Sequence, residues 1–131
     1  MGIVPVKEIH SLLKVVKSDA ATAKKLIGVD DTWAFNIAYN AALQASLALM
    51  YAKGFRPKGE AKHVSVILFL REALDKKYQQ YINRLDRMRK KRHLAVYGTS
   101  RTITQYEAVE SIKFALNFSK ELEEMVNGLL L

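Results

Sequence analysis

The stretch TWAFNIAYNAALQASLALMYAK, residues 32–53, decides the fold of this chain. It is rich in Ala, Leu and Met, which favour helix, and Gly54 follows as a natural stop. Small side chains let neighbouring helices approach closely. The stretch therefore predicts the central helix of a helical bundle, with alanines at 34, 38, 41, 42, 45, 48 and 52.

The residues before this stretch predict further helical structure. Between residues 5 and 17, apolar residues recur three and four positions apart, the repeat of a helix that buries one side. A separate helical turn or two is expected at residues 18–26, capped by Ser18 or Asp19 and ending at Gly28. The apolar positions of the first segment are Val6, Ile9, Leu12, Leu13 and Val16.

The residues after the stretch also predict helices. Residues 62–73 fit a short buried helix better than a strand, because every neighbouring segment is helical. A charged helix is expected over residues 76–93. Thr104 and Glu107 have the spacing of a capping box, in which a hydroxyl and a carboxylate satisfy free amides at a helix start. The last helix follows and reaches about residue 127.

These segments predict an all-α fold, most simply an up-and-down four-helix bundle with a short accessory helix. The length of 131 residues suits one compact domain over residues 1–131 and rules out a two-domain enzyme.

The charge balance points to a polyanionic partner or an anionic surface. Lys and Arg number 21 against 13 Asp and Glu, which gives a formal net charge of +8. We find neither a signal-type stretch nor one of membrane length, so we expect a cytoplasmic protein with no membrane association.

The residue types exclude several chemistries. Cysteine is absent, which removes disulfides, thiolate metal sites and cysteine nucleophiles. The sequence has no Gly-rich phosphate loop, no His-Glu-x-x-His and no Gly-x-Ser-x-Gly, and no histidines or carboxylates at metal-binding spacing. We therefore predict neither a metal site nor a cofactor.

The strongest functional signal is the basic run RLDRMRKKRH at residues 84–93. Six of its ten residues are Lys or Arg, and Asp86 is the one acidic residue. Like charges one helical turn apart repel each other, and a bound phosphate would relieve this. The alternative is an ordinary solvated helix face. The cations are Arg84, Arg87, Arg89, Lys90, Lys91 and Arg92.

Four polar side chains follow one side of this helix if it persists to Tyr97. Asp86, Arg89, His93 and Tyr97 are three, four and four positions apart. An imidazole and a phenol can move protons, while a guanidinium stabilises charge on a phosphate. This is a plausible set of groups for phosphodiester cleavage.

The segment Arg92-His-Leu-Ala-Val-Tyr97, the basic run before it and the long helix after it resemble the HEPN superfamily of small helical-bundle proteins. The segment Ala38-Tyr-Asn-Ala-Ala42 within the alanine-rich stretch is also similar to HEPN chains. The resemblance spans roughly residues 31–127.

The family signature is an arginine, four to six residues and a histidine, with a polar residue after the arginine. Arg87 and His93 enclose five residues and satisfy this spacing literally. Alternatively, Arg92 takes the arginine position, His93 the polar position and Tyr97 the histidine position. We favour the second register, because its spacing and basic surroundings resemble the tyrosine-bearing branch.

The resemblance implies a metal-independent endoribonuclease, in which the 2′-hydroxyl attacks its own phosphate. It also implies a homodimer with a shared cleft, often a toxin neutralised by a minimal nucleotidyltransferase antitoxin. Arg92 would stabilise the phosphorane, His93 would position or relay a proton, and Tyr97 would replace the catalytic histidine. Tyrosine, with a reference pKa near 10, donates a proton more readily than it accepts one.

RNA or a nucleotide would then bind along the basic run, with Arg87 as a further catalytic candidate and the substrate-binding candidates Arg84, Asp86, Arg89, Lys90, Lys91 and Asn40. The alternative function is that of a non-catalytic helical partner subunit of a minimal nucleotidyltransferase. For Asn40, together with Tyr39 and Gln44, interhelical hydrogen bonding is favoured over a substrate role. His63 is expected to begin a helix beside Lys62, as a capping or loop residue.

Overall fold

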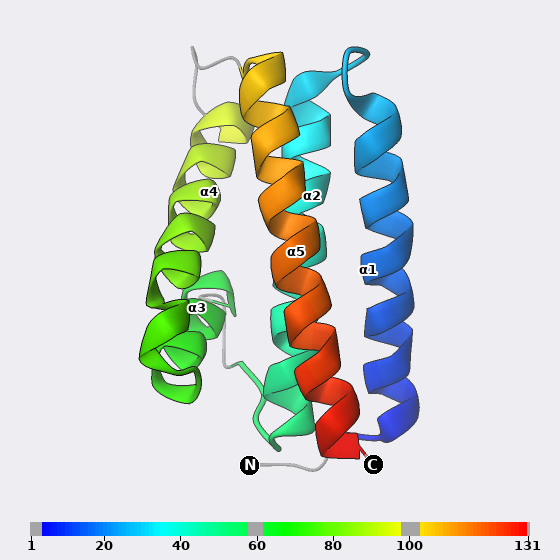
Figure 1. Ribbon diagram of the computed structural model, residues 1–131, viewed down its shortest axis with the longest axis vertical. Coiled ribbons are helices and arrows are strands. Elements are labelled where there is room, and N and C mark those ends of the chain that lie inside the picture. The colour runs from blue at the N-terminus through cyan, green and yellow to red at the C-terminus, as the bar shows by residue number, and fades with distance from the viewer. Residues whose placement is uncertain (1–3, 58–61, 98–102, 131) are drawn as a thin grey trace.

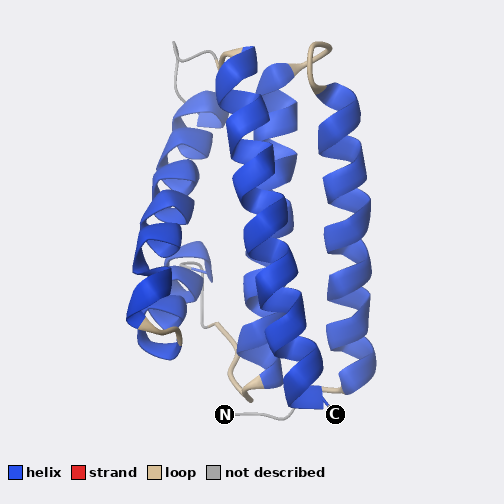
Figure 2. Ribbon diagram, in the orientation of Figure 1, coloured by secondary structure: helices blue, strands red, loops and turns tan. Residues whose placement is uncertain are grey.

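The computed structural model describes residues 4–57, 62–97 and 103–130, and for residues 93–97 it describes the helix without the side chains. This part of the chain is helical and contains no strand (Figure 2). The elements are α1 (Val6–Leu26), α2 (Asp31–Ala52), α3 (Lys62–Ala73), the short 3-10 helix η1 (Lys76–Tyr78), α4 (Gln79–Tyr97) and α5 (Gln105–Leu130).

The four long helices run alternately up and down, while the short helix α3 lies beside the lower half of α4 (Figure 1). Helix α2 contacts all the other α-helices, most extensively α1 and α5. The all-α prediction, with four long helices and a short accessory helix, is confirmed. The α2 bounds also agree with the predicted central helix to within one residue at each end.

Helix α2 is central because its small side chains are buried on most sides. Alanines at 34, 41, 42, 45 and 48 are fully buried, and the helix carries no strongly one-sided apolar stripe. Its larger apolar residues, among them Leu43, Leu47 and Leu49, fill the space between the surrounding helices. Close packing on several sides leaves few positions of α2 open to solvent.

The prediction of a separate segment at residues 18–26 is wrong, because α1 continues from Val6 to Leu26. The Ser18 carbonyl accepts a hydrogen bond of 3.0 Å from Thr22 Oγ1 inside the helix, so Ser18 does not start a new one. Alanines 20, 21 and 23 favour helix, and no Gly or Pro interrupts it. The expected stop at Gly28 is confirmed by its φ of 81°.

Both helices that begin near the upper end carry side-chain caps. Asp30 Oδ1 accepts a hydrogen bond of 3.0 Å from the Trp33 amide at the start of α2. Thr104 Oγ1 accepts one of 3.1 Å from the Glu107 amide, and Glu107 Oε1 accepts one of 3.4 Å from the Thr104 amide. This reciprocal pair confirms the predicted capping box.

Two glycines give a matched test of backbone conformation. Gly28 has a positive φ, so Gly28→Ala is expected to destabilise the fold by about 1 kcal/mol or more. Gly128 lies inside α5 with open space where a Cβ would stand, so Gly128→Ala is expected to stabilise by about 0.5–1 kcal/mol. Urea unfolding measures the change in the free energy of unfolding for each variant. Changes in the same direction for both variants would contradict this interpretation.

Candidate nucleic-acid interface

Helix α4 presents part of its basic run to α5. Arg84 Nη2 donates a hydrogen bond of 3.3 Å to the Glu110 carbonyl, and the Arg84 guanidinium carbon lies 4.9 Å from the centre of the Phe114 ring. Lys91 forms an ion pair with Glu107, the carboxylate of the α5 capping box. These two cations are therefore held in place by α5.

Other cations of the run are gathered around Asp86. Arg89 Nε donates to Asp86 Oδ1 at 2.9 Å, and Lys90 Nζ lies 3.4 Å from Asp86 Oδ2. Partial burial by itself would raise the pKa of Asp86. The hydrogen bond from Arg89 and the charges of Arg89 and Lys90 outweigh it and hold this pKa below its ordinary value. Asp86 is consequently ionised at neutral pH and orients Arg89.

Arg92, the next arginine along α4, contacts α2. Its guanidinium carbon lies 5.8 Å from the centre of the Tyr39 ring, within the range of a cation–π contact. Tyr39 is fully buried, and its hydroxyl lies 3.0 Å from Nδ1 of His63 on α3. The rings of Tyr39 and His63 are 5.7 Å apart between their centres. The three side chains join α2, α3 and α4 in one cluster.

The electrostatics of this cluster keep both rings neutral. Burial raises the pKa of Tyr39 far above its ordinary value, more than Arg92 and Arg89 lower it. Burial lowers the pKa of His63, and the charges of Arg92, Lys62 and Arg89 lower it further. The phenol keeps its proton and can donate it to Nδ1 in the tautomer that carries the His63 proton on Nε2. Positive charge thus exceeds negative charge around a half-buried histidine.

This environment predicts a pH dependence of stability. The pKa of His63 in the folded protein lies below its ordinary value of 6.5, so the unfolded chain binds the proton more readily. The contribution of neutral His63 to the free energy of unfolding is complete above about pH 6.5. It is lost as the pH falls through the pKa of His63 in the folded protein. His63→Gln is expected to flatten the fall in unfolding free energy between about pH 7.5 and pH 5.

The control for this measurement is His10→Gln, at an exposed position of α1 that leaves His63 in place. It should retain the wild-type profile in urea unfolding at each pH. A His63→Gln profile as steep as that of the wild type would contradict the assignment of this pH dependence to His63.

The structure locates the predicted residues as follows. Helix α4 extends to Tyr97, so positions 86, 89, 93 and 97 do follow one side of a continuous helix. The His93 and Tyr97 side chains lie outside the described part, so their predicted roles stay predictions. Arg87 is exposed. Asn40 Nδ2 donates to Asp19 Oδ2 of α1 at 2.7 Å.

Sequence reasoning missed the pairing of Tyr39 with His63. The interhelical hydrogen bonding predicted for Tyr39 is confirmed, with His63 as its partner. His63 does lie at the start of a helix, but it is inside the first turn of α3 and contacts α2 instead of being a loop residue. The available signal was a phenol in the middle of an alanine-rich helix, since a buried hydroxyl requires a partner.

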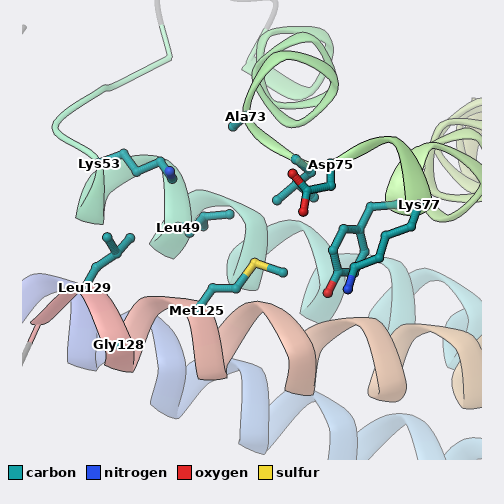
Figure 3. Close-up of a pocket in the computed structure, with 10 residues that line it drawn as sticks. Leu49, Lys53, Ala73, Asp75, Lys77, Met125, Gly128 and Leu129 are labelled. Carbon is teal, nitrogen blue, oxygen red and sulfur yellow. The ribbon is translucent and has the colours of Figure 1, made fainter.

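A cavity at the other end of the bundle has different chemistry. It measures about 380 Å³ and lies between the ends of α2, α3 and α5 (Figure 3). Lys53, Asp75 and Lys77 surround it, while Leu49 and Met125 supply apolar surface (Figure 3). Charges of both signs at its edge do not favour an extended anion as clearly as the α4 run does.

The fold and this basic helix define a class: an all-α bundle that carries an Arg-His-x-x-x-Tyr segment at the end of α4, the third of its four long helices. Residues 7–125 match the HEPN domain, so the chain belongs to the HEPN family and the resemblance seen in the sequence is confirmed. No curated protein matches the chain. In the described residues, no helix is long and apolar enough to cross a membrane.

The described residues also contain no group of three or more His, Asp or Glu side chains placed to hold a metal ion.

Proposed function

We propose that this HEPN protein binds RNA along α4 and cleaves it without a metal ion, as a toxin ribonuclease. The observation that carries the proposal is the position of Arg92. Its guanidinium is fixed against the buried Tyr39 ring, and Tyr39 in turn binds His63. Asp86 is already bound to Arg89 and Lys90. An incoming phosphate would therefore meet an excess of positive charge at a partly desolvated arginine.

The reaction is an internal transesterification. The 2′-oxygen of the ribose forms a bond to phosphorus, and the bond from phosphorus to the 5′-oxygen of the next nucleotide breaks. Arg92 stabilises the charge that develops on the phosphoryl oxygens. His93 accepts the proton of the 2′-hydroxyl, and Tyr97 donates a proton to the leaving 5′-oxygen, which suits a phenol. The products are a 2′,3′-cyclic phosphate and a 5′-hydroxyl end.

The same proposal includes two protein partners. A second copy of the chain would bring the two Arg92–Tyr97 segments to a shared cleft, as the HEPN resemblance implies. A minimal nucleotidyltransferase would act as the antitoxin. Sedimentation of the purified chain shows whether it forms a dimer. Co-expression with the protein encoded by the neighbouring reading frame tests whether that protein neutralises the toxin.

The experiment is incubation of end-labelled RNA with the purified protein in excess chelator. We expect fragments that end in a cyclic phosphate, and we expect His93→Ala to stop their formation. If RNA is bound but remains uncut at any protein concentration, the nuclease proposal fails. The chain would then fit the alternative function, a non-catalytic partner subunit of a nucleotidyltransferase.

A further inference from the structure

A groove of about 280 Å³ lies between α2, α4 and α5, bordered by the α5-facing cations of the basic run. Its floor includes the apolar side chains of Phe35 and Met88, both almost fully buried. Ser111 of α5 also lines it. The remaining lining residues are the charged side chains Arg84, Arg87, Lys91 and Glu107.

The groove carries an excess of positive charge. Three cations and one carboxylate line it, and the carboxylate of Glu107 is already bound to Lys91. Arg84 is held by the Glu110 carbonyl and the Phe114 ring, yet a guanidinium has five N–H donors and most of them remain available. Two of the cations are thus positioned before any ligand binds.

Two further groups in the groove have unused hydrogen-bonding capacity. Arg87 is exposed and forms no hydrogen bond or ion pair with the residues that the structure describes. Ser111 is only 7% exposed, and no side-chain hydrogen bond of its hydroxyl is formed within the described ranges. A guanidinium and a hydroxyl beside fixed cations are the groups that bind phosphate oxygens.

The groove and Arg92 lie on different sides of α4. Arg87 and Arg92 are five positions apart, which is about 140° around the helix at about 100° per residue. The outer way around α4 between them is the longer arc of about 220°, on which Lys90 lies about 60° from Arg87. The Lys90 side chain is 65% exposed and pairs with Asp86. A chain of phosphates that crosses the outer side of α4 from Arg92 would therefore pass Arg89 and Lys90, which share the Asp86 carboxylate, before it reaches Arg87.

We propose that this groove is a second phosphate subsite, which binds the backbone of an RNA strand whose scissile phosphate lies at Arg92. The inference rests on the proposed function, because it places a particular part of the RNA substrate. It also divides the work of the basic run: the side facing α2 acts on the scissile phosphate, and the side facing α5 holds a neighbouring nucleotide. Affinity should consequently depend on RNA length.

The test compares a dinucleotide with a single-stranded RNA of about 12 nucleotides, which exceeds the smallest sites known for single-strand binders. Arg87→Ala is expected to weaken binding of the long RNA about tenfold. It should weaken binding of the dinucleotide by no more than about twofold. The slope of log Kd against log salt concentration for the long RNA should fall by about 0.7, the value for one phosphate of a single strand. Ser111→Ala should change the same affinity in the same direction.

Lys120→Ala is the charge-matched control, at an exposed position of α5 outside the groove. An equal loss in Lys120→Ala would show only a general charge effect and overturn the subsite. Equal losses for the two RNA lengths would place Arg87 at the scissile phosphate and overturn it as well. If Arg87→Ala binds RNA as tightly as the wild type, and the wild type cleaves RNA, the subsite is overturned and the proposed function stands. If the wild-type chain binds no RNA, both the subsite and the proposed function are overturned.

Discussion

Arg92→Ala is expected to reduce metal-independent RNA cleavage by about a hundredfold to a thousandfold, the usual cost of losing one preorganised group that stabilises transition-state charge. Arg92 is the arginine of the run that contacts the Tyr39 ring, so its guanidinium is fixed before RNA arrives. A fixed charge requires little reorganisation when the pentavalent phosphorus forms. Single-turnover cleavage of labelled RNA, with saturating protein, measures this loss apart from binding.

Two variants control for charge and for the aromatic contact. Arg92→Lys keeps the charge but loses the planar fork that binds two phosphate oxygens, so it should restore only part of the rate. Arg56→Ala removes a similar contact elsewhere, since the Arg56 guanidinium carbon lies 5.2 Å from the centre of the Tyr51 ring. It should cut RNA at the wild-type rate. A folded Arg92→Ala protein with wild-type cleavage would refute the role assigned to Arg92.

Phe118→Ala is expected to lower the free energy of unfolding by about 3–5 kcal/mol, which is a large part of the stability of a small domain. Phe118 of α5 is fully buried. Its ring stacks on Phe114 with 5.7 Å between centres and meets the Tyr81 ring of α4 edge-on at the same distance. Removing the ring leaves a cavity that the surrounding helices can fill only partly.

The control for this prediction is Tyr106→Ala, an aromatic truncation on the same helix at a residue that is 75% exposed. It should change the stability by no more than about 0.5 kcal/mol. Urea unfolding followed by circular dichroism measures both variants. A loss below about 1 kcal/mol in Phe118→Ala would mean that α5 does not pack on α4 as described.

The fold was largely predictable because its signals are local. The composition of residues 32–53 predicted α2, and the spacing of Thr104 and Glu107 predicted the start of α5. The helix break predicted near Ser18 is wrong, because a local signal alone does not end a helix. Serine is a common cap, but a cap forms only where the backbone leaves the helix, and nothing in α1 forces it to do so.

The candidate site was predictable only in part. The basic run and the Arg-His-x-x-x-Tyr segment are visible in the sequence, and the HEPN match covers both. Which neighbouring helix each side of α4 faces was not visible. Helical periodicity gives the angle between two residues of one helix, whereas their neighbours depend on how that helix is rotated against the others.

The sequence by itself determined the helices, the family and the concentration of positive charge on α4, because propensity, periodicity and charge are properties of neighbouring residues. Tertiary structure decided that α5 engages Arg84 and Lys91 of the basic run. It also brought His63 to Tyr39 across 24 residues. Contacts of this kind follow from the packing of whole helices, in which each side chain meets partners that its own segment does not specify.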